Sequence, residues 1–202
     1  VGGYDRGYLT ATQFGAYIRS PYLFYLRYVH RPRIETVDDA AAELDAAAFG
    51  TLAHGVLERF GGDPAVKDAT DAAAITAYCH AQLDELAAAT FGDNARPAVA
   101  VQLRQLRRRL TWFAAAQAGR AREGWRIVCT ERLFGAGDPV YLAADTERLM
   151  PVRGKIDRID YHEKEDAWAI IDYKTGDRKP DPEKAHRKGG EWIDLQLPVY
   201  RR

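Results

Sequence analysis

The residue types best suited to chemistry lie in residues 150–176, where two β-type segments each carry an aspartate. Alternating β-type residues on both sides of a short charged gap are the pattern of a β-hairpin. If His162 pairs with Ala167, the antiparallel register sets Asp157 directly opposite Asp172. Partners on one face of such a pair lie about 5 Å apart at Cβ. The two carboxylates could therefore bind one divalent cation.

Lys174 follows two residues after the second aspartate and, at the period of a strand, shares its face. The same register pairs Ile159 with Ile170 and Tyr161 with Trp168 on that face. We therefore expect protein to cover it. Buried paired acids need a compensating positive charge, and oxygen ligands suit a hard cation such as Mg²⁺ or Mn²⁺. The alternative is a solvated hairpin with scattered surface charges.

A helix that ends at Gly61-Gly62 is predicted upstream of the hairpin, because apolar residues recur at helical spacing before these glycines. It carries His54 and Glu58, which are four residues apart and share a face. A single histidine on a helix is more often a structural residue than a metal ligand. The spacing alone leaves both roles open.

Further helices are predicted in the first part of the chain. Residues 9–30 form two short helices, the second with Ser20 as N-cap and Pro21 at its first position. The aromatic residues of this segment either pack in the core or stack on unpaired bases. Two long helices are expected, from Asp71 to Phe91 and from Pro97 to Glu123, each followed by a glycine.

The remaining predicted elements follow Trp125. Residues 125–134 alternate as a first strand, which would place Glu131 on a buried face near the hairpin. A short strand is expected at Val140–Ala143. Near the end of the chain, Gln196 and Tyr200 are four residues apart and would face the same way on a closing helix.

Two groups of basic residues could contact a phosphate backbone. The first lies on the second long helix, and a solvated helix face is its alternative. The second follows the Lys174 strand in a basic loop and helix start, and an ordinary flexible loop is its alternative. The first group is Arg104, Arg107 and Arg108, and the second is Arg178, Lys179, Lys184, His186, Arg187 and Lys188.

Length and composition limit the class of protein. The 202 residues fit one domain, and the formal net charge of zero means that any nucleic-acid surface must be local. No apolar run approaches the ~20 residues that cross a bilayer. The two cysteines lack metal-type spacing, which suits a reducing cytosol. Because Met150 is the first methionine, we expect a domain cut from a longer protein.

Four segments resemble one known family. GKIDRID at 154–160 and IIDYKTG at 170–176 resemble motifs II and III of the PD-(D/E)XK nuclease superfamily, in its RecB-like branch. GTLAHGVLE at 50–58 resembles the helix that brings a metal-binding histidine, and LQLPVY at 195–200 is similar to the branch's Q-x-x-x-Y motif. The segment at 9–29 resembles the start of the nuclease domain in AddB-type helicase–nuclease subunits and CRISPR-associated exonucleases.

The resemblance implies an α/β fold with a restriction-endonuclease-like core, in which helices flank a mixed central sheet. It implies a single nuclease domain over residues 1–202. The helical part would cover about 9–123, and the catalytic sheet and closing helix about 125–202.

The resemblance further implies a DNA nuclease that uses Mg²⁺ or Mn²⁺ and leaves a 5′-phosphate and a 3′-hydroxyl. Lys174 would orient the attacking water or stabilise charge on the phosphorane. The implied metal ligands are His54, Asp157, Asp172 and the backbone carbonyl of Tyr173, and the auxiliary residues are Glu131, Gln196 and Tyr200. Ser20 stands where AddB-type relatives carry one of four cluster-binding cysteines, so no iron–sulfur cluster is expected.

The expected role is an exonuclease of DNA recombination or repair, in the cytoplasm and with a helicase domain or subunit as partner. A catalytically silent DNA-binding or scaffolding module of a helicase–nuclease complex is the alternative. Silent members usually lose an acid or the lysine, and this chain keeps them. Hydrolysis of a small phosphate ester is a third function, which no feature of the sequence favours.

Overall fold

The structure is a computed structural model that describes residues 8–30, 44, 46–92, 96–135, 140–143, 149–175, 187–188 and 191–192. The chain divides into two compact units. The first comprises Val1–Val37, Arg132–Ile156 and Arg178–Arg202, and the second Asp38–Glu131 and Asp157–Asp177.

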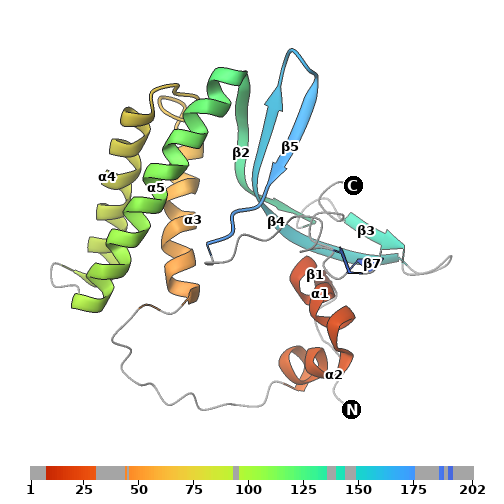
Figure 1. Ribbon diagram of the computed structural model, residues 1–202. Coiled ribbons are helices and arrows are strands. Elements are labelled where there is room, and N and C mark those ends of the chain that lie inside the picture. The colour runs from red at the N-terminus through yellow and green to blue at the C-terminus, as the bar shows by residue number, and fades with distance from the viewer. Residues whose placement is uncertain are drawn as a thin grey trace. The chain divides into compact units, whose positions relative to one another are not determined.

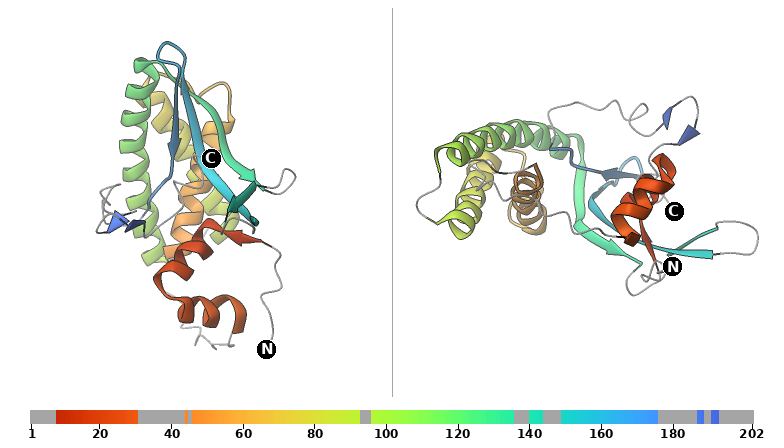
Figure 2. Two further views of the ribbon diagram at one scale, coloured as in Figure 1. Left: turned by 90° about the vertical axis from the view of Figure 1, so that its right-hand side faces the viewer. Right: turned by 90° about the horizontal axis from the view of Figure 1, so that it is seen from below.

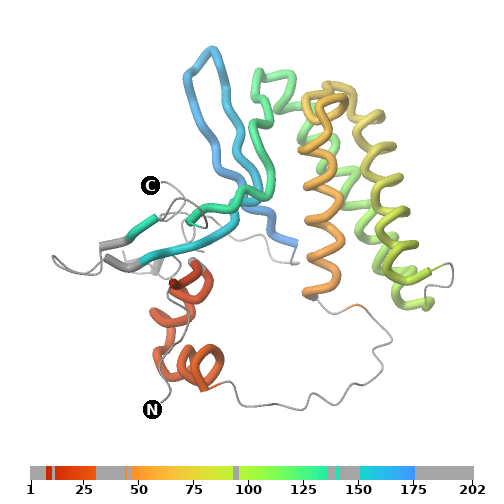
Figure 3. The backbone as a smooth tube through the Cα atoms, turned by 180° about the vertical axis from the view of Figure 1, so that it is seen from behind, coloured from red at the N-terminus to blue at the C-terminus, as the bar shows by residue number. Residues whose placement is uncertain are grey.

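Three helices form the core of the second unit: α3 (Ala46–Gly62), α4 (Ala72–Phe91) and α5 (Pro97–Glu123). Helix α4 packs against both α3 and α5, and the three lie side by side from the front and from behind (Figures 1 and 3). Their buried apolar side chains form one cluster, which includes Val56, Phe60, Ile75, Leu83 and Leu110.

The helix ends agree with the predicted bounds because their signals are local. The Asp71 side chain accepts a hydrogen bond from Ala73 N–H and begins α4, and Gly92 ends it. Pro97 starts α5, and Gly124 ends it with a φ of 107°, a left-handed conformation that glycine adopts without strain.

The predicted hairpin is present, with the predicted register. Strand β4 (Leu149–His162) pairs antiparallel with β5 (Ala167–Ile171), from Arg158 opposite Ile171 to His162 opposite Ala167. Strand β5 ends at Ile171, so the Asp172–Lys174 segment continues just beyond the ladder. The charged gap forms the turn, as predicted.

The faces of the hairpin differ from expectation. Trp168 is 64% exposed, so the prediction that protein covers its face is wrong there. Beyond Asp157, the buried side chains of β4 are instead those of Arg158, Asp160 and His162. The reason lies in α5, whose Arg120 donates to Asp160 and whose Glu123 carbonyl contacts His162.

Strand β2 (Trp125–Phe134) has the predicted bounds and lies next to β4 in the sheet. Helix α3 approaches it closely at Gly61, where a Cβ atom would meet Cγ2 of Thr130. The hydroxyl of Thr130 also donates to the Glu58 carbonyl of α3 at 3.5 Å. This contact ties α3 to β2 within the second unit.

The first unit contains β1 (Leu9–Thr10), α1 (Ala11–Arg19), α2 (Pro21–Phe24) and the π-helix η1 (Tyr25–His30). Helices α1 and α2 follow each other at an angle, drawn in red in Figure 2. Thr10 forms a capping box with Gln13, and Ser20 caps α2 as predicted. Phe24 is buried, whereas Tyr22 is 68% exposed, so core packing does not account for all the aromatic residues.

The described strands confirm the expected mixed α/β fold. Strand β1 pairs parallel with β4, and β3 (Val140–Ala143) pairs antiparallel with it. With β2 and β5, they make a five-stranded sheet. Strands β6 (Arg187–Lys188) and β7 (Glu191–Trp192) form a separate pair, so Arg187 and Lys188 lie in a strand where a loop and helix start were expected. No described helix is long and apolar enough to span a membrane.

Candidate metal centre

Three potential metal ligands converge from three elements of the second unit. His54 lies on α3, Glu131 on β2 and Asp157 on β4, and one ligand atom from each lies within 4.8 Å of the others. His54 Nδ1 is 3.3 Å from Glu131 Oε1 and 3.9 Å from Asp157 Oδ1. A nitrogen and two carboxylate oxygens thus face one point.

Packing places His54 and an unusual backbone conformation places Glu131. The neighbours of His54 on α3, Ala53 and Val56, are buried in the core, which fixes the helix. Glu131 has a φ of 51°, although it lies in a strand and is not glycine. Such residues cost on the order of 1–3 kcal/mol and occur where the surroundings hold them. This conformation accompanies the contact of its carboxylate with His54.

Asp157 is 9% exposed and accepts a hydrogen bond from the backbone N–H of Tyr173 at 2.7 Å. Burial raises the pKa of Asp157 above its ordinary value. The negative charges of Asp172 and Glu131 act in the same direction, whereas the Tyr173 N–H and His54 oppose it. A bound cation would therefore relieve an unfavourable concentration of negative charge.

Asp172, predicted as a metal ligand, lies near Asp157 of the triad. It forms an ion pair with Lys174, whose Nζ lies 2.6 Å from its Oδ2. Asp172 lies near enough to Asp157 to raise its pKa but is not a member of the converging triad. Glu131, predicted as auxiliary, occupies the third place in the triad.

Tyr173 contacts two members of the triad at once. Besides its N–H bond to Asp157, its ring lies edge-on to the His54 ring, with centroids 6.0 Å apart and planes at 81°. On the other side it meets Phe113 of α5 in the same manner. Tyr173 was predicted as a ligand through its carbonyl, and the described contacts are through its N–H, its ring and its hydroxyl.

The donor set fits a divalent cation. Carboxylate oxygens suit Mg²⁺ and Mn²⁺, and an imidazole is compatible with a transition metal such as Mn²⁺. The raised pKa of Asp157 also favours a site that is completed by positive charge. Cys79 has no place in it, because burial raises the pKa of its thiol to about 12 and it lies inside the helical core.

The family model of the PD-(D/E)XK nuclease superfamily matches residues 8–201. The chain belongs to this superfamily. The nucleases of this superfamily use divalent metals, and the triad described above supplies a candidate site for the metal.

The basic residues of this nuclease-superfamily chain lie in several places. Arg104 and Arg108 are exposed on α5, whereas Arg107 pairs with Asp84 of α4. The Arg108 guanidinium lies 4.9 Å from the ring centre of Trp112, which is 60% exposed. The side chains of Arg187 and Lys188 are not described, and Arg178, Lys179, Lys184, His186, Gln196 and Tyr200 lie outside the described residues.

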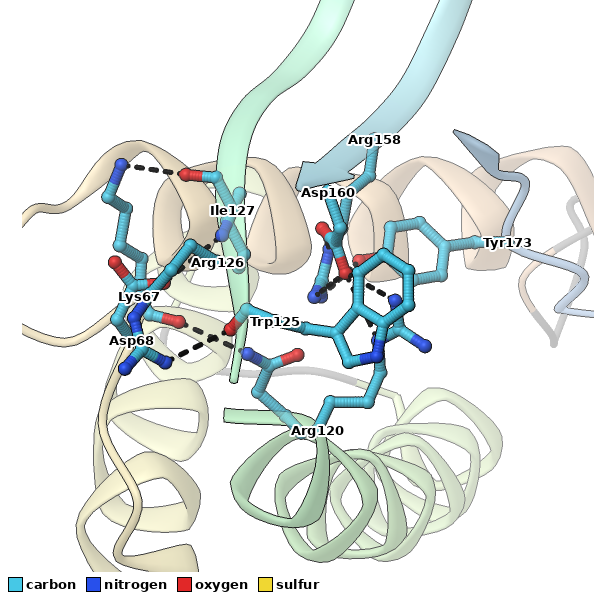
Figure 4. Close-up of polar contacts among 10 residues, drawn as sticks. Lys67, Asp68, Arg120, Trp125, Arg126, Ile127, Arg158, Asp160 and Tyr173 are labelled. Carbon is cyan, nitrogen blue, oxygen red and sulfur yellow. Dashed lines mark hydrogen bonds and ion pairs between the residues drawn. The ribbon is translucent and has the colours of Figure 1, made fainter. Parts of the chain in front are cut away.

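Sequence reasoning missed a buried ionic network behind the metal centre of this nuclease fold (Figure 4). Asp160 accepts hydrogen bonds from Arg158 and Arg120, and Arg158 also reaches the hydroxyl of Tyr173. A signal was present in the motif itself. Arg158 and Asp160 alternate with Asp157 along one strand, so the pair had to lie on the opposite face.

Proposed function

We propose that the chain is a DNA nuclease that hydrolyses phosphodiester bonds with Mg²⁺ or Mn²⁺. One observation carries the proposal: His54, Glu131 and Asp157 converge, and the ion pair of Asp172 and Lys174, which flank Tyr173 just after β5, lies beside them. A scaffold would not require this concentration of ionisable groups in a partly buried place.

Each residue then has a role. His54, Glu131 and Asp157 would hold the cation, with Asp172 and the Tyr173 carbonyl as further candidate ligands. When bound, a divalent cation supplies Lewis-acid activation of the phosphate and lowers the pKa of a bound water. The Lys174 side chain is 48% exposed, so its ammonium group can meet the substrate and stabilise the charge that develops on phosphate.

Arg104, Arg108 and Trp112 would bind the DNA strand. They recur every four residues on α5, on the side away from the buried cluster. Among the described residues, neither Arg104 nor Arg108 pairs with a carboxylate, and α5 has no acid before Glu123. Two such arginines with an exposed aromatic ring suit the phosphates and bases of a single strand.

The finer assignment rests on the sequence motifs. We propose a RecB-like, AddB-type nuclease domain without an iron–sulfur cluster, acting as an exonuclease in recombination or repair with a helicase partner. The opening segment, the Q-x-x-x-Y match and Ser20 at the cysteine position support this assignment. A single domain and a cytosolic location stay predictions.

The test is digestion of single- and double-stranded DNA, labelled at the 5′ or 3′ end, with Mg²⁺, Mn²⁺ or EDTA. Cleavage in either metal and none in EDTA is expected. Lys174→Ala should lower the rate at least about 100-fold, the effect of removing a donor to transition-state charge. Lys164→Ala, at an exposed lysine in the hairpin turn, is the matched control.

Two results would count against the proposal. Equal cleavage by the wild type and Lys174→Ala would remove this residue from the mechanism. DNA binding that Mn²⁺ leaves unchanged, with no substrate cut, would favour the silent scaffolding module.

A further inference from the structure

A fully buried carboxylate lies behind the metal centre and receives two guanidinium groups. Asp160 accepts from Arg158 Nε at 2.5 Å and Nη2 at 2.7 Å. It also accepts from Arg120 Nε at 3.1 Å and Nη2 at 2.9 Å (Figure 4). The side chains of Arg158 and Asp160 are 2% and 0% exposed, so this pair is shielded from water, whereas the Arg120 side chain is 32% exposed.

Such a group is not explained by stability alone. Taking charges out of water is costly, and well-packed apolar residues often serve a core as well as a buried ion pair. What a buried network can add is a fixed geometry for the groups bonded to it. The group that this network holds in place is identified by the remaining hydrogen bond of Arg158.

Arg158 connects the buried ion pair to Tyr173. Arg158 uses Nε and Nη2 for Asp160, and its Nη1 donates to the Tyr173 hydroxyl at 3.2 Å. Because the guanidinium is planar and rigid, the position of Asp160 determines where Nη1 points. The ring of Tyr173 is thus held at its hydroxyl end by the ion pair.

The other end of Tyr173 lies in the metal centre. Its N–H donates to Asp157 Oδ2, and Asp157 Oδ1 lies 3.9 Å from His54 Nδ1. Its ring lies edge-on to the His54 ring. A displacement of Tyr173 would therefore disturb an acid and a histidine of the triad together.

We infer that Arg158, Asp160 and the Tyr173 hydroxyl are positioning residues that hold the metal ligands of this site in their binding geometry. Arg120 anchors the carboxylate from α5. The inference rests on the proposed metal site and adds a purpose for the buried network. Partners that orient metal ligands typically contribute about 10- to 100-fold to metal affinity or activity.

The first test removes one hydroxyl. Tyr173→Phe keeps the ring, the N–H bond and the ion pair, and should weaken Mn²⁺ binding about tenfold in calorimetry without DNA. The Mg²⁺ concentration for half-maximal cleavage should rise by the same factor. Tyr78→Phe is the matched control, since its hydroxyl donates to the Arg59 carbonyl away from the triad.

The second test asks whether the hydroxyl acts through Arg158. Arg158→Lys keeps the positive charge but lacks the fork that reaches Asp160 and Tyr173 together. Each single variant should weaken Mn²⁺ binding about tenfold, and the double variant should also weaken it about tenfold rather than a hundredfold. Thermal unfolding curves in EDTA identify a temperature at which every variant is folded, and Mn²⁺ binding is measured at that temperature.

The outcomes separate this inference from the proposed function. An unchanged Mn²⁺ affinity in Tyr173→Phe, with the wild type binding and cutting, overturns the positioning role alone. Independent effects of the two variants overturn the link through Arg158. A wild-type protein that binds no Mn²⁺ overturns both the inference and the nuclease proposal.

Discussion

At the scale of single residues, Asp157 illustrates how burial and metal binding oppose each other. Its pKa is raised, so in the absence of metal the folded protein binds this proton more tightly than the unfolded chain does. The stability from this group is fully present below the ordinary aspartate pKa of 3.8 and is lost as the pH rises through the folded-state pKa. At neutral pH the ionised carboxylate therefore destabilises the metal-free fold.

Asp157→Asn should accordingly raise the melting temperature in EDTA at pH 7. The gain should shrink as the pH falls through the raised pKa of Asp157 toward the ordinary aspartate value of 3.8, because the wild-type carboxyl is then protonated as well. The stabilisation by Mn²⁺ should disappear in the variant, because the amide does not replace the anionic ligand. Melting curves with and without Mn²⁺ across this pH range check both parts, and a lower melting temperature in EDTA at pH 7 would contradict the first.

The sequence predicted some site residues and could not predict others, for physical reasons. Asp157 and His54 were expected together because the family resemblance implied both as metal ligands, whereas helical spacing alone left the role of His54 open. Glu131 was expected only as an auxiliary residue, because alternation along a strand gives no sign of a φ of 51°. The network was missed because its members come from α5, β4 and the segment after β5, whose distances depend on tertiary packing.

At the scale of elements, the boundaries were predictable where a cap or turn residue marked them. Gly124 ends α5, and a Cβ atom there would lie 2.8 Å from Nε2 of His162. The hairpin register followed from its short turn. Which face of the hairpin is covered could not be predicted in this way, because it depends on how α5 packs. Trp168 is exposed as a result.

Gly124→Ala should destabilise the protein by on the order of 2 kcal/mol, because alanine is strained at a φ of 107° and would crowd His162. Gly119→Ala is the control on the same helix, where nothing lies within 4 Å of the added methyl. That change should stabilise by roughly 0.5–1 kcal/mol through helix propensity. Denaturant unfolding measures both, and equal effects would contradict the prediction.

At the scale of the whole molecule, the formal net charge of zero limits how DNA can be attracted. Without a global positive field, binding must come from a few local contacts, and Arg104 and Arg108 on α5 are the described candidates. The affinity should then depend only moderately on salt. Each phosphate contact on a single strand contributes about 0.7 to the slope of log K against log salt.

Arg108→Gln should lower that slope by about 0.7 and weaken binding of a single-stranded oligonucleotide. Fluorescence anisotropy in EDTA measures binding without cleavage. Arg122→Gln serves as the control, since Arg122 is exposed on the same helix but lies about 21 Å along its axis from Arg108. An equal change of the slope in both variants would mean that the positive charge of the protein as a whole causes the effect, which would contradict a specific phosphate contact at Arg108.

The close approach of α3 to β2 at Gly61 bears on how mutational tolerance in this chain is interpreted. Even alanine at this position would collide with Thr130, whereas Gly62, the next residue, has nothing within 4 Å of an added methyl. Because His54 lies on the same helix and Glu131 follows Thr130, a library screened for DNA cleavage would score position 61 as intolerant. That intolerance would report the spacing of two backbones, and no chemistry at Gly61 itself.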